Sequence, residues 1–198
     1  MTVHCAAIIA GGASRRMGTP KALLDYQGKP LISHIAVTLR TVFPDIVVVT
    51  QDARFAEAAG ARAVPDVFPN RGVLGGIHAA LSHFKEPTFC VACDLPYLRD
   101  DVLEFFASRG RGADAFVPRI DGFAEPLHAL YAPSLLPHFE RALQNEKPPA
   151  VADVLRRCSV RWLDAELRAF DPELRFLTNW NTPEDVASTV EIDRTLKQ

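Results

Sequence analysis

Short apolar runs that alternate with helical patterns constrain the fold of this chain more than any other feature. The strand-like runs are residues 4–10, 45–50, 61–66, 87–94 and 113–118. The helical patterns between them are residues 30–43, 52–60, 75–84 and 99–110. Strands that are apolar on both faces and alternate with helices indicate a parallel sheet covered on both sides. The sequence therefore predicts a three-layer α/β/α, Rossmann-like fold with a mostly parallel sheet.

The second half of the chain follows a less regular pattern. We expect strands at residues 126–131, 159–164 and 175–179, and helices at residues 133–144 and 149–158. Thr182 and Pro183 begin a last helix, because threonine caps helices and proline suits the first helical position. No linker, repeat or shift in composition divides the chain, so we predict a single domain over residues 1–198.

Composition limits what the chain binds. The formal net charge is −2, which does not favour a broad surface for nucleic acid or for an anionic membrane. No apolar run approaches the roughly 20 residues of a membrane span. The run at residues 5–10 is shorter than the apolar part of a signal peptide, about 7–15 residues. We expect a cytoplasmic protein that binds anions through local clusters of positive charge.

Two of the four cysteines, Cys90 and Cys93, form a CxxC pair within a strand-like run. Residues i and i+3 of a strand point to opposite faces of the sheet, so the two sulfurs should not converge on a metal or on each other. We interpret them as buried strand cysteines. The six histidines lack metal-ligand spacing and are interpreted as surface or core-edge residues.

The segment AGGASRRMGTPK follows the first predicted strand and combines glycines with positive charge. Gly11 and Gly12 let a ligand approach backbone N–H groups, and Arg15, Arg16 and Lys21 supply donors for phosphate oxygens. The spacing matches neither the P-loop pattern GxxxxGK[ST] nor the Rossmann pattern GxGxxG. We infer a phosphate-binding loop of another type. The alternative is a glycine-rich turn with solvated arginines.

Asp94 ends the run TFCVACD, at the tip of a predicted strand. A carboxylate that faces a phosphate loop suits Mg²⁺, which commonly takes one or two carboxylates plus substrate phosphates. The alternative is an ordinary turn aspartate before Pro96. Ligands bind at the carboxyl ends of the strands in sheets of this kind. Further candidates at strand exits are Gln51, Asp52, Asp66 and Arg119.

These motifs together resemble the molybdenum cofactor guanylyltransferases, nucleotidyltransferases with a nucleotide-diphospho-sugar transferase-like fold. The resemblance covers most of the chain, through AGGASRRMGTPK, GKPL at 28–31, GVLGGI at 72–77, CDLP at 93–96, PLHALY at 126–131 and NWNTPED at 179–185. It implies transfer of GMP from GTP to molybdopterin, with Mg²⁺ as cofactor, giving the guanine dinucleotide form of the cofactor and pyrophosphate. It also implies a nucleotide-binding part at residues 1–118 and an acceptor-side part at residues 119–198.

The resemblance assigns roles on the nucleotide side. Contacts to GTP are implied for Ile9, Ala10, Gly11, Gly12, Lys21, Thr50, Asp66 and Asp94. Among these, Lys21 corresponds to the lysine that binds the triphosphate, and Asp94 to the aspartate that binds Mg²⁺. The family usually has asparagine where this chain has Thr50-Gln51-Asp52. It usually has proline, alanine and aspartate at the positions of Val73, Gly75 and Pro20.

On the acceptor side, Asn179 and Asn181 correspond to a pterin or acceptor pocket. The alternative is a hydrogen-bonded turn, since Thr182 already explains a helix start there. From topology we also expect the acceptor side to be lined by Arg119, Asp121 and Glu125.

The implied reaction requires no general base. The phosphate of molybdopterin has a second pKa of about 6 and is largely anionic at neutral pH, so it can attack the α-phosphorus of GTP directly. Arg16 and Lys21 would clamp the triphosphate and the leaving pyrophosphate, while Mg²⁺ on Asp94 bridges phosphate oxygens.

Three alternatives stay open. The first is the related cytidylyltransferases, which tend to read Ala-Ala-Gly where this chain reads Ala10-Gly11-Gly12. The second is a sugar-phosphate nucleotidyltransferase. The third is a nucleotide-binding partner without catalysis, against which the presence of both Lys21 and Asp94 argues. The expected partners are GTP, molybdopterin, and molybdoenzymes or their chaperones. We expect no nucleic acid, no membrane, and a monomer or weak oligomer.

Overall fold

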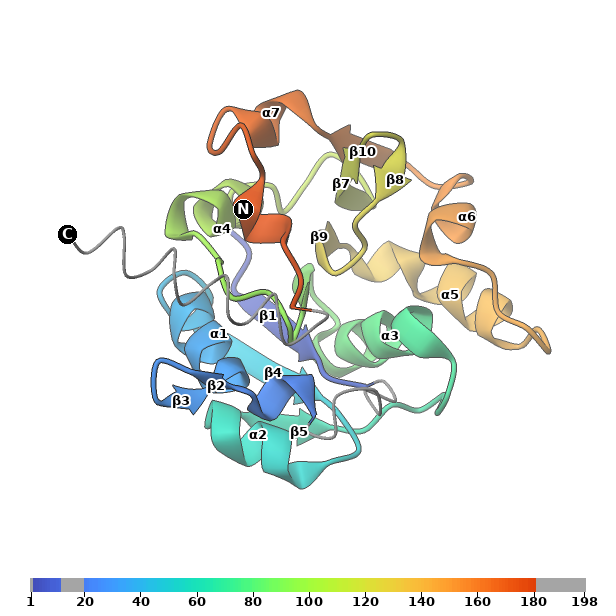
Figure 1. Ribbon diagram of the computed structural model, residues 1–198. Helices are drawn as coiled ribbons and strands as arrows, with labels where there is room; N and C mark the ends of the chain where they lie inside the picture. The colour runs from blue at the N-terminus through green and yellow to red at the C-terminus, as the bar shows by residue number, and fades with distance from the viewer. Residues whose placement is uncertain (1, 12–19, 181–198) are drawn as a thin grey trace.

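The computed structural model describes residues 2–11 and 20–180, arranged around a central mixed sheet (Figure 1). The strands of this sheet are β1 (Cys5–Ile9), β4 (Asp45–Val49), β5 (Arg62–Val64), β6 (Thr88–Ala92), β7 (Ala115–Ile120), β8 (Phe123–Ala124), β9 (His128–Tyr131) and β10 (Val160–Leu163). A separate small hairpin joins β2 (Asp25–Tyr26) and β3 (Lys29–Pro30). The helices are α1 (Leu31–Arg40), α2 (Ala53–Ala59), α3 (Gly72–Phe84), α4 (Asp100–Ala107), α5 (Leu136–Leu143), α6 (Val151–Leu155) and α7 (Ala165–Arg168). Short 3₁₀ turns are η2 (Lys21–Leu23), η3 (Pro133–Leu135) and η4 (Arg175–Leu177).

The sheet has the strand order β10-β7-β9-β6-β1-β4-β5, with β8 paired to β7. β1 lies between β4 and β6 and is parallel to both. β9 is antiparallel to β6 on one side and to β7 on the other. β7 therefore runs in the same direction as β6 and β1. The carboxyl ends of β7, β6, β1, β4 and β5 consequently share one edge of the sheet, the edge at which ligands bind in such folds.

Helices cover both faces of the sheet, as the sequence predicts. Ala6 and Ile8 of β1 belong to the hydrophobic core that includes residues of α1, α2 and α4. Ala7 and Ile9 belong to the core on the opposite face, with residues of α3, α5 and α6. Figure 1 shows these two groups of helices on either side of the sheet. The predicted three-layer α/β/α fold is confirmed, and β1 is buried along its whole length because both faces are covered.

The two cysteines of the CxxC pair lie on opposite faces, as predicted. Cys90 is part of the core beside α3 and α5, whereas Cys93 packs against the core beside α1 and α4. Two histidines differ from the prediction. His78 and His128 are buried rather than at the surface or core edge, with 4% and 1% of their surface exposed. The ring of His128 packs against three aromatic side chains, those of Phe89, Phe106 and Phe176.

Most errors in the predicted elements lie in the second half of the chain. Residues 175–179, predicted as a strand, begin with the 3₁₀ turn η4. The reason is local: the Asp171 carboxylate accepts hydrogen bonds from the backbone N–H groups of Glu173 and Arg175, which satisfies donors that a strand would offer to a neighbour. Residues 126–131 do form a strand, but an antiparallel one, β9. Neither α7 nor the β2–β3 hairpin was predicted, and the predicted helix at residues 182–185 lies outside the described residues.

None of the helices in the described part of the chain combines the length and the apolar character needed to cross a bilayer.

Candidate active site at the carboxyl edge of the sheet

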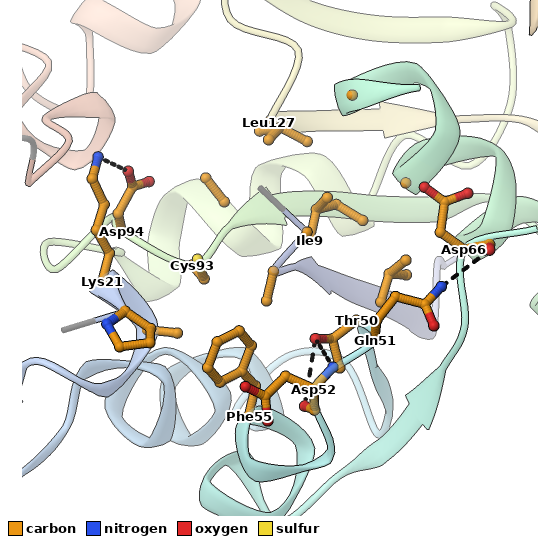
Figure 2. A pocket seen from close by; sticks show the side chains of 18 of the residues that line it. Ile9, Lys21, Thr50, Gln51, Asp52, Phe55, Asp66, Cys93, Asp94 and Leu127 are labelled. Carbon is orange, nitrogen blue, oxygen red and sulfur yellow. Dashed lines mark hydrogen bonds and ion pairs between the residues drawn. The ribbon is translucent and has the colours of Figure 1, made fainter. Parts of the chain in front are cut away.

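A cavity of about 740 Å³ opens at the shared carboxyl edge, where β1, β4, β5 and β6 end. Figure 2 shows its interior, with Ile9 near the middle of the view, Lys21 and Asp94 on the left and Asp66 on the right. Its lining residues are Ile9, Ala10, Gly11, Pro20, Lys21, Ala22, Val49, Thr50, Gln51, Asp52, Phe55, Asp66, Pro69, Asn70, Gly72, Gly76, Ala92, Cys93, Asp94 and Leu127. The cavity thus lies at the strand exits that the sequence analysis selected.

The floor of the cavity depends on the close approach of α3 to β1. A Cβ atom on Gly76 would lie 2.6 Å from the Cγ2 atom of Ile9, a distance that real Cβ contacts essentially never show. Only glycine therefore fits there without a shift of helix or strand. After Ile9 the backbone continues beside β4, because the Ala10 N–H donates a hydrogen bond to the Val49 carbonyl over 3.0 Å. The backbone of Ala10 and Gly11 is thereby held at the cavity wall.

At one end of the cavity Lys21 donates a hydrogen bond to Asp94, with 2.9 Å between Nζ and Oδ2. Lys21 comes from η2 and Asp94 from the loop after β6, so the pair joins two segments far apart in the sequence. Both side chains are largely buried, with 18% and 16% exposed. The Asp94 carbonyl also accepts a hydrogen bond from the backbone N–H of Trp180 over 2.9 Å. The Lys21 ammonium, the Asp94 carboxylate and the segment that ends at Trp180 are therefore close together at this end of the cavity.

Asp66, which follows β5, lies at the other end of the cavity. Its Oδ1 atom accepts a hydrogen bond from the Phe68 N–H over 2.8 Å. The carboxylate lies against Gly75 of α3 so closely that a Cβ there would be 2.8 Å from Oδ2. Burial raises the pKa of Asp66, and the Phe68 hydrogen bond and His78 oppose this only in part. A half-buried carboxylate in this position is stabilised by N–H donors that a ligand brings.

The exit of β4 has its own hydrogen bonds. The Thr50 hydroxyl accepts from the Asp52 N–H over 3.0 Å, and the Asp52 side chain caps α2 at Arg54. The ion pair with Arg54 lowers the pKa of the Asp52 carboxyl, chiefly through their side-chain hydrogen bond. Gln51 donates from Nε2 to the Asp66 carbonyl over 3.2 Å (Figure 2). Gln51 thus supports the segment that carries Asp66.

The predicted site residues divide into three groups. Those that line the cavity are Ile9, Ala10, Gly11, Lys21, Thr50, Asp66 and Asp94. Asn179 is half-buried beside the buried Trp180 and is not among the lining residues. Gly12, Arg16 and Asn181 lie outside the described residues.

Sequence reasoning missed several lining residues. Phe55 lies in the first turn of α2, the helix that follows β4, and an aromatic residue near a strand exit is a usable signal. Leu127 lines the cavity because β9 runs antiparallel beside β6, an arrangement that the sequence pattern did not indicate. Cys93 was interpreted only as a strand residue. Burial raises the pKa of its thiol to about 12, which disfavours the thiolate form.

Comparison with known proteins identifies the family of this chain. The family described as the MobA-like NTP transferase domain matches residues 6–162. A "probable molybdenum cofactor guanylyltransferase" from Methanosarcina mazei is 32% identical, over 93% of this chain and 89% of the relative. A protein of the same name from Pelotomaculum thermopropionicum is 34% identical, over 90% of this chain and 88% of the relative.

Among solved structures, molybdopterin-guanine dinucleotide biosynthesis protein A from Archaeoglobus fulgidus is similar over 96% of this chain and 98% of its own, with 34% identity and a TM-score of 0.81. Both the fold and the sequence are thus shared over nearly the whole chain. The expected nucleotidyltransferase class is confirmed, and this chain belongs to the MobA-like NTP transferase family, among the relatives of the molybdenum cofactor guanylyltransferases.

Proposed function

We propose that this chain transfers GMP from GTP to molybdopterin, with Mg²⁺, and releases pyrophosphate. The observation that carries the proposal is the polarity of the cavity, which has the Lys21–Asp94 pair at one end and the Asp66 carboxylate at the other (Figure 2). A nucleoside triphosphate has matching polarity, since its phosphates need cations and its base offers hydrogen-bond donors. We place the triphosphate at Lys21 and the base at Asp66.

Asp66 supplies the preference for guanine. A carboxylate can accept from the N1–H and the 2-amino group of guanine together, whereas cytosine and adenine offer a single amino group beside an acceptor nitrogen. The Phe68 N–H fixes the carboxylate through Oδ1. Gln51, in the loop after β4, donates to the backbone carbonyl of the same residue. The acceptor for guanine is thus supported on two sides.

The donor set at Asp94 fits Mg²⁺. No group of three or more His, Cys, Asp or Glu side chains within residues 2–11 and 20–180 is arranged to hold a metal ion. Mg²⁺ needs no such group, because one carboxylate and the oxygens of the triphosphate serve as its protein and substrate ligands. Bound there, the ion would neutralise charge on the phosphates and orient them.

The reaction is an exchange of phosphate bonds. A terminal phosphate oxygen of molybdopterin forms a bond to the α-phosphorus of GTP, and the bond from that phosphorus to the bridging oxygen of the β-phosphate breaks. The electron pair leaves with pyrophosphate, and Lys21 stabilises the charge that develops there. The incoming phosphate is already anionic, so no side chain has to remove a proton. Arg16, outside the described residues, is proposed as a second cation for the triphosphate.

Pyrophosphate release tests the proposal. The chain is incubated with Mg²⁺, molybdopterin and each of the four nucleoside triphosphates in turn. We expect release with GTP and formation of the guanine dinucleotide. Release with CTP alone would assign the protein to the cytidylyltransferases. Binding of GTP without turnover on molybdopterin or on sugar phosphates would overturn the enzymatic assignment.

Other expectations stay predictions. A cytoplasmic location, a monomeric or weakly associating chain, and delivery of the product to molybdoenzymes or their chaperones are proposed with the function.

A further inference from the structure

A second cavity, of about 250 Å³, lies at the end of β7. It is lined by Ile120, Asp121, Glu125, Arg168, Glu173, Leu174, Leu177 and Thr178. These residues come from the turn between β7 and β8, from the chain that leads into β9, and from the segment of α7 and η4. The lining is mixed: apolar side chains, one guanidinium and carboxylates.

This cavity opens at the same edge of the sheet as the first one. β7 is parallel to β6 and β1, because β9 is antiparallel to both of its neighbours. Ile120 at the end of β7 is thus on the same edge as Asp94 after β6. In Figure 1 the ends of β7 and β8 and the descending segment after α7 lie above the region where β1 ends.

Two short stretches of chain connect the cavities. Thr178 lines the second cavity, and two residues later the Trp180 N–H donates to the carbonyl of Asp94. Glu125 lines the second cavity, and two residues later Leu127 lines the first. Two residues of extended chain span at most about 7 Å. The second cavity is therefore next to the Asp94 end of the first cavity, the end at which the phosphates are placed.

Glu125 is the carboxylate in this cavity that lacks a hydrogen-bond partner among the described residues. It forms neither a hydrogen bond through its side chain nor an ion pair with any residue that the structure describes. Its burial raises its pKa. The other carboxylates are more exposed: the side chains of Asp121 and Glu173 are 86% and 74% exposed. Glu125 is thus the acceptor that a bound ligand would satisfy.

The remaining lining residues define the shape of that ligand. Arg168 is held by Asp164, at 2.7 Å from Nε to Oδ1, and by the Pro172 carbonyl at 3.1 Å. It forms a fixed wall rather than a free anion site. Leu174 and Leu177 add a small apolar surface to a lining that is otherwise mostly polar. The cavity suits a flat heterocycle with N–H donors on one edge.

We propose that the second cavity binds the pterin ring of the acceptor, with the Glu125 carboxylate accepting hydrogen bonds from the N3–H and 2-amino groups. The inference deepens the proposed function and rests on it. Pterin and guanine share the same 2-amino-4-oxopyrimidine edge, so a carboxylate suits both. Asp66 reads this edge in the nucleotide, at the end of the first cavity away from Asp94, and Glu125 reads it in the acceptor, in the second cavity.

The test compares two free ring systems as probes of the full-length chain. Pterin carries the 2-amino group, whereas lumazine carries an oxygen in its place. Binding of each is followed by ring fluorescence in the presence of GTP. We expect the wild type to bind pterin about tenfold or more tightly than lumazine, the factor expected for a hydrogen bond to a charged group. Glu125→Gln should abolish this preference, and Glu125→Asp should retain part of it.

Glu166→Gln is the matched control, because Glu166 is an exposed carboxylate on α7 that does not line the cavity. It should keep the preference for pterin. Glu125→Gln should also raise the KM for molybdopterin and leave GTP affinity unchanged. An unchanged pterin preference in Glu125→Gln, no pterin binding by the wild type, or a loss of GTP affinity in the variant would each overturn the assignment. Failure of GMP transfer with intact pterin selectivity would instead reject only the proposed function.

Discussion

Lys21 and Asp94 neutralise each other at one end of the candidate active-site cavity, the end proposed to hold the phosphates, with 2.9 Å between ammonium and carboxylate. The ammonium therefore occupies space beside the only carboxylate proposed as a magnesium ligand. A cation and a metal ion compete for one carboxylate, so the metal should bind well only when a triphosphate draws Lys21 away. Within the described residues, the charges of Lys21 and Asp94 thus balance each other before the nucleotide binds.

Lys21→Met should therefore have two opposite effects. Turnover should fall by about 10²- to 10³-fold, the usual cost of removing one group that stabilises developing charge. Binding of Mn²⁺ without nucleotide, measured by electron paramagnetic resonance, should become tighter than in the wild type. Lys21→Arg keeps the cation and should bind Mn²⁺ as weakly as the wild type. Equal Mn²⁺ affinity in all three proteins would contradict competition at Asp94.

Asp66→Asn should remove the selection of guanine. An amide offers one acceptor atom and places donors against the donors of the base, so affinity for GTP should fall about tenfold or more. ITP lacks the 2-amino group and is the matched nucleotide. We expect the wild type to prefer GTP over ITP, and the variant to bind both equally in a calorimetric titration. A variant that still prefers GTP would place the recognition of guanine elsewhere.

The same carboxyl gives GTP affinity a pH dependence. Burial raises the pKa of Asp66, and only the ionised form accepts both hydrogen bonds. Affinity for GTP should therefore decline as the pH falls, beginning at a higher pH than for an ordinary aspartate. ITP affinity should decline less. Titrations from neutral to mildly acidic pH check this, and parallel curves for the two nucleotides would be inconsistent with it.

Two neighbouring glycines should respond differently to the same change. Gly76→Ala would place a methyl group 2.6 Å from the stiff side chain of Ile9, and overpacking of this kind costs about 1–3 kcal/mol of stability. Gly75→Ala meets the carboxylate of Asp66, which can rotate away, and approaches the Phe68 carbonyl oxygen to 3.1 Å, which requires only a small shift. It should weaken GTP binding more than it lowers the free energy of unfolding. Urea unfolding measures the loss of stability in both variants, and GTP titration measures the loss of affinity. Equal losses of stability in the two variants would contradict the prediction.

His128 should make the fold sensitive to acid. Its burial among phenylalanines lowers its pKa to about 3, from about 6.5 in an unfolded chain. The unfolded state thus binds the proton more readily, so the contribution of His128 is complete above about pH 6.5 and declines as the pH falls, by up to about 1.4 kcal/mol per pH unit. His128→Leu should flatten the pH dependence of urea unfolding. His138→Gln, at an exposed position, should keep the wild-type slope.

The cavity residues at the carboxyl ends of the strands could be predicted from the sequence. Apolar runs located β1, β4, β6 and β7, and the rule that ligands bind at carboxyl ends then selected Lys21, Asp66 and Asp94. These choices needed only local patterns. The fold class followed from the same alternation of strands and helices.

The acceptor side was harder to predict because its geometry depends on long-range pairing. The run PLHALY has the same apolar pattern whether it pairs parallel or antiparallel, so the direction of β9 was not visible. Residues 175–179 are apolar enough for a strand, but the Asp171 carboxylate binds their first N–H group and turns the chain. The second cavity is lined by residues next to both features, so the sequence pattern did not indicate it.

The antiparallel β9 also has a consequence for folding. It belongs to the later part of the chain but completes the hydrogen bonding of β6, which comes from the earlier part. A fragment that stops at residue 118 would leave β6 as an unprotected edge, open to pairing with other copies. Residues 1–118 and residues 119–198 should therefore not be separable as folded fragments, since β9 of the later part completes the hydrogen bonding of β6 in the earlier part.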